Sequence, residues 1–201
     1  TRVLVMVDDM PLISGDAGQV QWNLIATENV NQVEIIKGAS SALYGSSALN
    51  GIINIRTSYP KKSEIDKNPS VGYTKVNLNF GVIDFAKRSA LNWYGNKRNT
   101  FQGVEFLQSI KYENLDLSFG GNIFDDEGYR KDEETHRKRF NMNSLFKSEK
   151  ISGLSYGINA NALFESTASA IIWNGFDEAY IALNNDVITT SGDSYNVDPY
   201  V

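Results

Sequence analysis

The second half of this chain alternates apolar and polar side chains with a period of two residues. In LDLSFGGNIF (residues 115–124), positions 115, 117, 119, 121 and 123 hold Leu, Leu, Phe, Gly and Ile. The positions between them, 116, 118, 120 and 122, hold Asp, Ser, Gly and Asn. VNLNFGV (76–82), FNMNSLF (140–146) and LSYGINANALF (154–164) repeat the pattern. Because successive side chains of a strand point to opposite faces of the sheet, the pattern predicts strands with one apolar and one polar face.

Two architectures accommodate such strands. A soluble sandwich or meander turns the apolar face inward, whereas a transmembrane barrel turns it to lipid and lines its lumen with the polar face. We predict strands at about 71–85, 101–111, 115–124, 138–147 and 153–165, followed by the start of a sixth. The connections between these segments alternate between long and short, which favours an up-and-down barrel with one elaborated end.

Composition and charge exclude several classes of function. The formal net charge of −5 and the pI near 5.0 argue against a general nucleic-acid-binding surface, which is usually basic. The chain has no cysteine, so disulfides and thiolate metal sites are excluded. No apolar run approaches the roughly 18 residues of a membrane helix, an absence that leaves a barrel open. Because both ends read as strands, we expect a fragment of a longer protein, with any targeting signal upstream.

The first 58 residues have a different pattern. VLVMV (3–7), VEIIK (33–37) and GIINIR (51–56) are short, continuous apolar runs, which predict strands covered on both faces. SYPKKSEIDKNPS (58–70) is rich in Pro, Lys and Ser and is typical of a linker. We therefore predict a first domain over 1–58, a linker over 59–70, and barrel strands over 71–201.

One stretch, VEIIKGASSALYGSSALNGIINIRT (33–57), joins two predicted strands through Gly, Ser and Ala. It resembles the end of the plug domain of TonB-dependent outer-membrane receptors. VLVMVDDMPL (3–12) resembles an earlier plug strand, and ENLDLSFGGNIFDDEGYR (113–130) resembles receptors from Bacteroidetes-type bacteria. The resemblance implies the C-terminal half of a plug, an α+β unit with a small mixed sheet and short helices. Antiparallel up-and-down transmembrane strands would follow, as the first part of a barrel of about 22 strands.

The same resemblance implies a function and a location. Such receptors import a scarce nutrient across the bacterial outer membrane, such as an iron–siderophore, haem or cobalamin, with energy relayed through TonB. The implied partners are TonB (through a segment N-terminal to the plug), outer-membrane lipid and a small ligand such as a metal chelate. Neither a cofactor nor covalent chemistry is implied, so we expect no enzyme activity.

The plug motif carries residues with expected scaffold roles. They are Glu34, Lys37, Gly38, Ser40, Tyr44, Gly45, Gly51 and Asn54. The glycines suit backbone conformations that a Cβ would hinder, and Ser40 or Ser41 suits a helix cap. The resemblance places Gln32 where the family often has an Arg that makes ionic contacts between plug and barrel. Glu34 and Lys37 are the remaining candidates for such a contact, or else ordinary strand charges.

Aromatic residues mark the predicted long loops. Trp93 and Tyr94 fall in one such loop, and Trp173 falls beyond the fifth strand. Both positions suit the aromatic belt of a membrane protein or contacts to a substrate. The charged segment 125–139 reads as a solvated loop, because its carboxylate spacing does not match an EF-hand.

Catalytic motifs are not matched. GASSALYG (38–45) lacks the Gly-Lys-Ser/Thr ending of a phosphate-binding loop, and YGSSALNG (44–51) is not a Gly-x-Ser-x-Gly elbow. The single histidine, His136, lies in the charged segment. We predict no catalytic, cofactor or metal residues. The alternatives are a soluble β-rich binding module with an α/β cap and, within the resemblance, a glycan importer of the starch-utilisation type.

Overall fold

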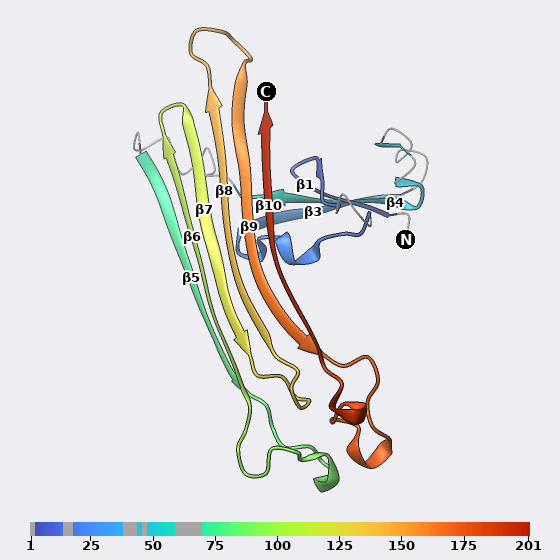
Figure 1. Ribbon diagram of the computed structural model, residues 1–201. Helices are drawn as coiled ribbons and strands as arrows, with labels where there is room; N and C mark the ends of the chain where they lie inside the picture. Colours follow the sequence, from blue (N-terminus) through green and yellow to red (C-terminus); the bar gives the residue numbers. More distant parts are fainter. Residues whose placement is uncertain (1–2, 14–17, 38–43, 46–47, 59–69) are drawn as a thin grey trace.

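The computed structural model describes residues 3–13, 18–37, 44–45, 48–58 and 70–201, which form two sheets. We call the four-stranded sheet, in the order β2-β1-β4-β3, the N-terminal sheet, and the six-stranded sheet, in the order β10-β9-β8-β7-β6-β5, the strand wall. The strands of the N-terminal sheet cross the direction of the wall strands (Figure 1). Among the described residues, no helix has the length and apolar character needed to cross a membrane.

The N-terminal sheet is mixed. It contains β1 (Val3–Val7), β2 (Met10–Pro11), β3 (Val30–Ile36) and β4 (Gly51–Thr57), with the 3-10 helices η1 (Trp22–Leu24) and η2 (Thr27–Asn29) before β3. β1 runs parallel to β4, whereas β2 and β3 are antiparallel to their neighbours. The β1–β2 hairpin turns on Asp8 and Asp9, both with positive φ. Two such residues fit a two-residue hairpin loop, where aspartate tolerates the left-handed backbone.

Burial differs between the strands of this sheet. Most side chains of β1 and β4 are buried, as the apolar runs predict for central strands. The prediction that VEIIK is covered on both faces is wrong, because Val33 and Ile35 are 51% and 63% exposed. β3 lies at the edge of the sheet and contributes to packing through Val30 and Ile36. One apolar cluster of the N-terminal sheet also includes Leu163 of the wall.

The wall is an open antiparallel sheet in which each strand pairs with the next in the chain. Its strands are β5 (Ser70–Val82), β6 (Thr100–Tyr112), β7 (Leu115–Asp126), β8 (Thr135–Lys147), β9 (Ser155–Ser169) and β10 (Ile188–Tyr200). The pairing confirms the predicted up-and-down order. Each strand has between 12 and 15 residues, more than the roughly 9–11 that a tilted strand needs to span a bilayer.

The connections gather at two ends of the wall, which we call the turn end and the loop end. The turn end holds residues 113–114 and 148–154, and the loop end holds 83–99, 127–134 and 170–187 (Figure 1). Short 3-10 helices lie in the two large loops: η6 (Ser89–Leu91), η7 (Phe176–Glu178) and η8 (Leu183–Asn185). The middle loop is shorter than the predicted 125–137, because β7 and β8 extend further, and His136 therefore lies in β8.

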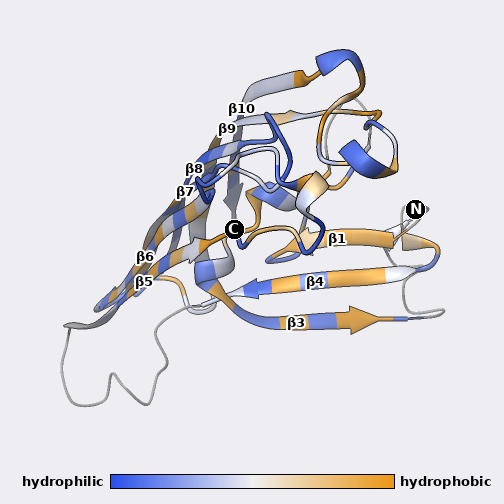
Figure 2. Ribbon diagram, turned by 90° about the horizontal axis from the view of Figure 1, so that it is seen from below, coloured by the Kyte–Doolittle hydropathy of each residue, from blue (hydrophilic) through white to orange (hydrophobic). Residues whose placement is uncertain are grey.

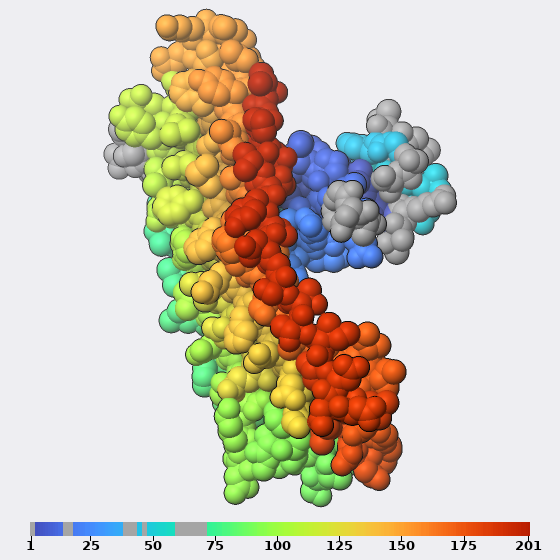
Figure 3. Space-filling model, viewed as in Figure 1, coloured from blue at the N-terminus to red at the C-terminus, as the bar shows by residue number. Residues whose placement is uncertain are grey.

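The two faces of the wall differ in character and in what covers them. The N-terminal sheet projects from one face (Figures 2 and 3), which carries the polar side chains of the alternating segments. Asp116, Ser118 and Asn122 of β7 are buried on this face. The opposite face carries Phe119, Ile123, Phe140, Tyr156 and Ile158, all of them exposed. The apolar face is therefore not the inside of a closed soluble core.

Candidate functional site: the interface between the N-terminal sheet and the wall

A buried ion pair joins the N-terminal sheet to the wall. Arg139 of β8 places its Nη2 2.5 Å from Oε2 of Glu28 in η2, and both side chains are almost fully buried. Asn141, two residues further along the same face of β8, donates from Nδ2 to Oε1 of Glu28 over 2.6 Å. Arg139 also donates from Nη1 to the carbonyl oxygen of Asn23 over 3.2 Å. Both oxygens of the Glu28 carboxylate are thus bound by wall residues.

A second group of contacts fixes the end of β4 to the wall. Ser58 Oγ and Tyr73 Oη lie 2.7 Å apart, and Ser118 Oγ donates to the carbonyl oxygen of Ser58 over 3.1 Å. Ser118 in turn lies 2.8 Å from Ser109, Oγ to Oγ, and both are fully buried. These hydroxyl groups anchor the segment directly after β4 to β5, β6 and β7.

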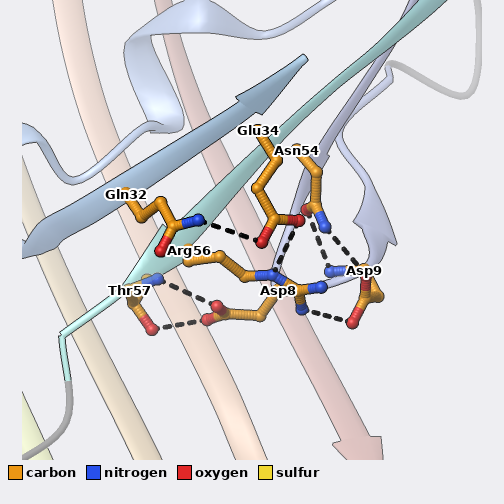
Figure 4. Close-up of polar contacts among 7 residues, drawn as sticks. All are labelled: Asp8, Asp9, Gln32, Glu34, Asn54, Arg56 and Thr57. Atoms are coloured by element: carbon orange, nitrogen blue, oxygen red, sulfur yellow. Dashed lines mark hydrogen bonds and ion pairs between the residues drawn. The ribbon is translucent and has the colours of Figure 1, made fainter. Parts of the chain in front are cut away.

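A third group of polar contacts ties the β1–β2 hairpin to β3 and β4 (Figure 4). Asp9 accepts from Asn54 Nδ2 over 2.8 Å and pairs with Arg56, which also approaches Glu34 over 3.4 Å. The hydrogen bond with Asp9 raises the pKa of Arg56 above its usual value. Asp8 accepts from the backbone N–H of Thr57 over 2.9 Å. These contacts hold the hairpin against the end of β4 that faces the wall.

The structure brings together only some of the predicted motif residues. Glu34 and Asn54 meet in the hairpin group, whereas Lys37 is exposed at the end of β3. Gly51 has a φ of 133°, and a Cβ there would lie 2.8 Å from the carbonyl oxygen of Ile36.

The other motif residues lie between β3 and β4. Tyr44 is exposed, and Gly45 has a φ of 82°. Gly38 and Ser40 lie outside the described residues.

Sequence reasoning missed the residues that make the ionic contact with the wall. Glu34 pairs with Arg56 of its own sheet, and the carboxylate that reaches the wall is Glu28. One signal was present, because Arg139 continues the polar face that Asn141 and Asn143 define in FNMNSLF. A charged residue on that face needs a partner when it is covered.

The predicted aromatic residues meet at the loop end of the wall. Trp93 donates from Nε1 to the carbonyl oxygen of Tyr129 over 3.1 Å, and its ring contacts Tyr94 edge to face. The guanidinium group of Arg130 lies over the rings of Tyr129 and Trp173, at 4.9 and 4.5 Å from their centroids. Trp93 and Trp173, 80 positions apart, are therefore linked through Tyr129 and Arg130.

The loops 83–99 and 170–187 also meet through a contact between a cation and an aromatic ring. Arg88 lies 3.6 Å above the ring of Phe176 and donates to its carbonyl oxygen over 2.8 Å. Lys131 donates from its backbone N–H to the carbonyl oxygen of Tyr180 over 2.8 Å. Each of the three loops thus contacts the other two, which gives a joined surface of aromatic rings and guanidinium groups.

The contacts at these two sites are ion pairs, hydrogen bonds and cation–π contacts. Among the described residues, no group of three or more His, Asp or Glu side chains is placed to hold a metal ion. His136 is exposed and pairs with Asp125, Nδ1 to Oδ1, over 2.8 Å. The buried polar groups at the interface hold two parts of the protein together through one ion pair and several hydrogen bonds.

Known proteins resemble both parts of the chain. Residues 1–52 match the family model described as the TonB-dependent receptor plug domain. The vitamin B12 transporter BtuB of Vibrio cholerae serotype O1 is 31% identical over 131 residues, which are 65% of this chain and 20% of that protein. The BtuB protein of Vibrio vulnificus strain CMCP6 is 41% identical over 96 residues, 42% of this chain and 16% of that protein.

The chain therefore spans about a fifth or less of the length of these relatives. An alignment of 131 residues is longer than the part of the chain before β5, so the similarity to the Vibrio cholerae protein extends into the wall. Together with the mixed sheet and the anchored interface, the family match identifies the N-terminal part. Residues 1–52 of this chain belong to the plug-domain family of TonB-dependent receptors.

Proposed function

We propose that this chain forms the plug and first barrel strands of an outer-membrane receptor that imports a scarce nutrient with energy relayed through TonB. In this proposal residues 1–58 are the C-terminal part of the plug, 59–70 the linker, and 71–201 the first six strands of a barrel of about 22 strands. The observation that carries the proposal is the wall itself, whose polar face holds a plug-family sheet while its apolar face is uncovered.

The apolar face has the layout expected for contact with lipid. Aromatic rings lie toward both ends of this face, with Tyr112 and the Phe146–Tyr156 pair at the turn end. Phe80 lies toward the loop end, and the Phe164–Tyr195 pair lies near the middle of β9 and β10. Aromatic girdles of this kind border the apolar band, about 25 Å tall, of outer-membrane barrels. The proposed location is therefore the bacterial outer membrane, with the loop end outside.

The plug would sit in the lumen because its wall contacts are polar. Arg139, Asn141 and Ser118 would each be costly on a lipid-facing surface, yet each makes a hydrogen bond to the part of the chain that precedes the wall. TonB is the proposed partner, through a segment N-terminal to the plug. This role needs no covalent chemistry, and no catalytic residue is proposed.

The proposed ligand is a small nutrient such as a metal chelate. Relatives of this chain are named vitamin B12 transporters, which makes cobalamin one candidate beside iron–siderophores and haem. Trp93, Tyr94 and Trp173 are the proposed contacts at the loop end. Aromatic faces and the guanidinium group of Arg130 suit a large, flat or anionic ligand, through stacking and cation–π contacts.

Uptake by the intact protein tests this function. The gene would be expressed in a bacterium that lacks its own vitamin B12 receptor, and uptake of labelled cyanocobalamin and of ferric siderophores would be measured with and without TonB. We expect TonB-dependent uptake of one ligand, reduced by Tyr94→Ala but not by Tyr112→Ala, which makes the same change at the turn end. The proposal would be contradicted if the measured uptake of every ligand were the same with and without TonB.

A further inference from the structure

Two rows of side chains cross the apolar face of the wall toward its loop end. The row nearer the middle of the strands pairs Leu78 of β5, Val104 of β6, Ile123 of β7 and Lys138 of β8. The row nearer the loop end pairs Phe80, Gln102, Asp125 and His136 of the same four strands. Each row therefore begins with an apolar side chain on β5 and ends with a basic one on β8.

The parts of these rows on β5–β7 line an open groove of about 350 Å³. Its apolar lining consists of Leu78, Phe80, Val104 and Ile123, which are between 44% and 76% exposed. Gln102 and Asp125 line it on the side of the loop end. The groove thus offers an apolar bed with polar groups at one end, and such a bed suits a hydrocarbon chain that carries a polar head.

Lys138 is the cation that lies directly beside this groove. Its side chain is exposed and makes no hydrogen bond or ion pair with the residues that the structure describes. Its neighbours across the two adjacent strands are Ile123 and Phe164. A lysine on a lipid-facing surface is costly unless its ammonium group reaches the charged interface. The position of Lys138 therefore favours an anionic group at this level of the wall.

The other charged side chains on this face direct such an anion toward the groove. His136 lies 2.8 Å from Asp125 and 3.7 Å from Glu134, so carboxylates already surround it. Asp193 of β10 lies two strands from Lys138 in the same row, on the side away from the groove. An anion bound to Lys138 is thus repelled from the β10 side and favoured on the β7 side.

We infer that the groove and Lys138 form a binding site for an anionic, phosphate-bearing lipid in the leaflet at the loop end. One acyl chain lies along Leu78, Val104 and Ile123, and a phosphate oxygen accepts from the ammonium group of Lys138. A hydrogen bond between charged groups of this kind is stronger than a neutral one. The inference rests on the membrane placement in the proposed function, and it adds one position on the wall where a lipid is held.

Photocross-linking of the intact protein in phosphatidylcholine vesicles tests the inference. The vesicles would contain a small fraction of a phosphatidylglycerol probe or of a phosphatidylcholine probe, each with the same diazirine in its acyl chain. Cross-linked residues would be identified by mass spectrometry. Lys138→Gln removes the charge, and Lys150→Gln is the matched control, because it makes the same change at an exposed lysine of the turn end. Val104→Phe fills the groove without a change of charge.

We expect the phosphatidylglycerol probe to label residues 78–80 and 123 about fivefold more than the phosphatidylcholine probe, the factor expected for one lysine beside an anionic lipid. Lys138→Gln should abolish this preference, and Lys150→Gln should preserve it. Val104→Phe should lower labelling of the groove by both probes but leave residues 156–158 of the same face unchanged. A preference that survives Lys138→Gln, or groove labelling that never exceeds that of residues 156–158, would overturn the inference.

The outcomes also separate this inference from the proposed function. Even labelling of the whole apolar face, without an effect of Lys138→Gln, would contradict the lipid site but support the membrane placement. Absence of labelling on this face would contradict the placement and the lipid site together. A preference that depends on Lys138, in a protein that imports none of the tested nutrients, would support the lipid site and contradict the import function.

Discussion

Glu28 Oε2 lies 2.5 Å from Arg139 Nη2, although the two residues are 111 positions apart and lie in η2 and in β8 of the wall. Both side chains are almost fully removed from solvent, at 1% and 3% exposed. A pair of this kind fixes position more than it adds stability, because desolvation offsets much of the attraction. Its value to this protein is that it sets where the plug meets the wall.

Removal of one member of this pair should be more damaging than removal of both. Glu28→Ala leaves Arg139 buried without its counter-charge, which costs about 3–5 kcal/mol. The double variant Glu28→Ala with Arg139→Met should cost less, because it buries no lone charge. Urea unfolding followed by tryptophan fluorescence, to which Trp22 in η1 contributes beside Trp93 and Trp173, measures both values. A double variant that loses as much as the two single variants combined would contradict the coupling of these residues.

The backbone at Gly51 should not tolerate a side chain. Its φ of 133° is open to glycine alone, and a Cβ would press on the carbonyl oxygen of Ile36. We expect Gly51→Ala to lower the free energy of unfolding by roughly 1–3 kcal/mol. Gly192→Ala is the control, since a Cβ there meets no atom within 4 Å. Similar unfolding midpoints for the two variants would show that the β3–β4 contact is not strained by a Cβ.

Acid should release one contact at the loop end. The hydrogen bond with Lys97, followed by that from the backbone N–H of Thr100, lowers the pKa of Glu127 below its ordinary value of 4.5. A carboxyl group whose pKa is lower in the folded state stabilises the fold above its unfolded pKa, and this contribution is lost as the pH falls through the folded value.

Melting temperatures of the parent and Glu127→Gln measure this effect between pH 7 and pH 3. The parent should melt higher at pH 7, and the difference should shrink once the pH falls below 4.5. A difference that stays constant down to pH 3 would show that the Glu127 contacts do not depend on its charge.

Much of the wall could be predicted from the sequence. The alternation in LDLSFGGNIF, FNMNSLF and LSYGINANALF is a local property of the chain, and strand geometry converts it directly into two faces. The turn between β6 and β7 falls where Glu113 and Asn114 interrupt the alternation. Strand ends were less predictable, because the polar ends of β7 and β8 pair beyond the apolar band.

The attachments between the two sheets could not be predicted in the same way. Glu28 precedes β3 without any periodic pattern, and its partner lies on a strand that only the tertiary fold brings near. The exposure of Val33 and Ile35 has the same origin, since an apolar run does not reveal whether its strand is central or at an edge. The loop-end surface likewise depends on contacts between loops that are far apart in sequence.

In the proposed arrangement one face of the wall meets lipid while the other encloses the plug. Spin labels placed one at a time along β7 of the intact protein in lipid vesicles test it most directly, with relaxation by oxygen reporting contact with hydrocarbon. We expect high oxygen accessibility at 117, 119 and 123 and low accessibility at 116, 118 and 122. Accessibility without alternation, or with the two sets reversed, would contradict it.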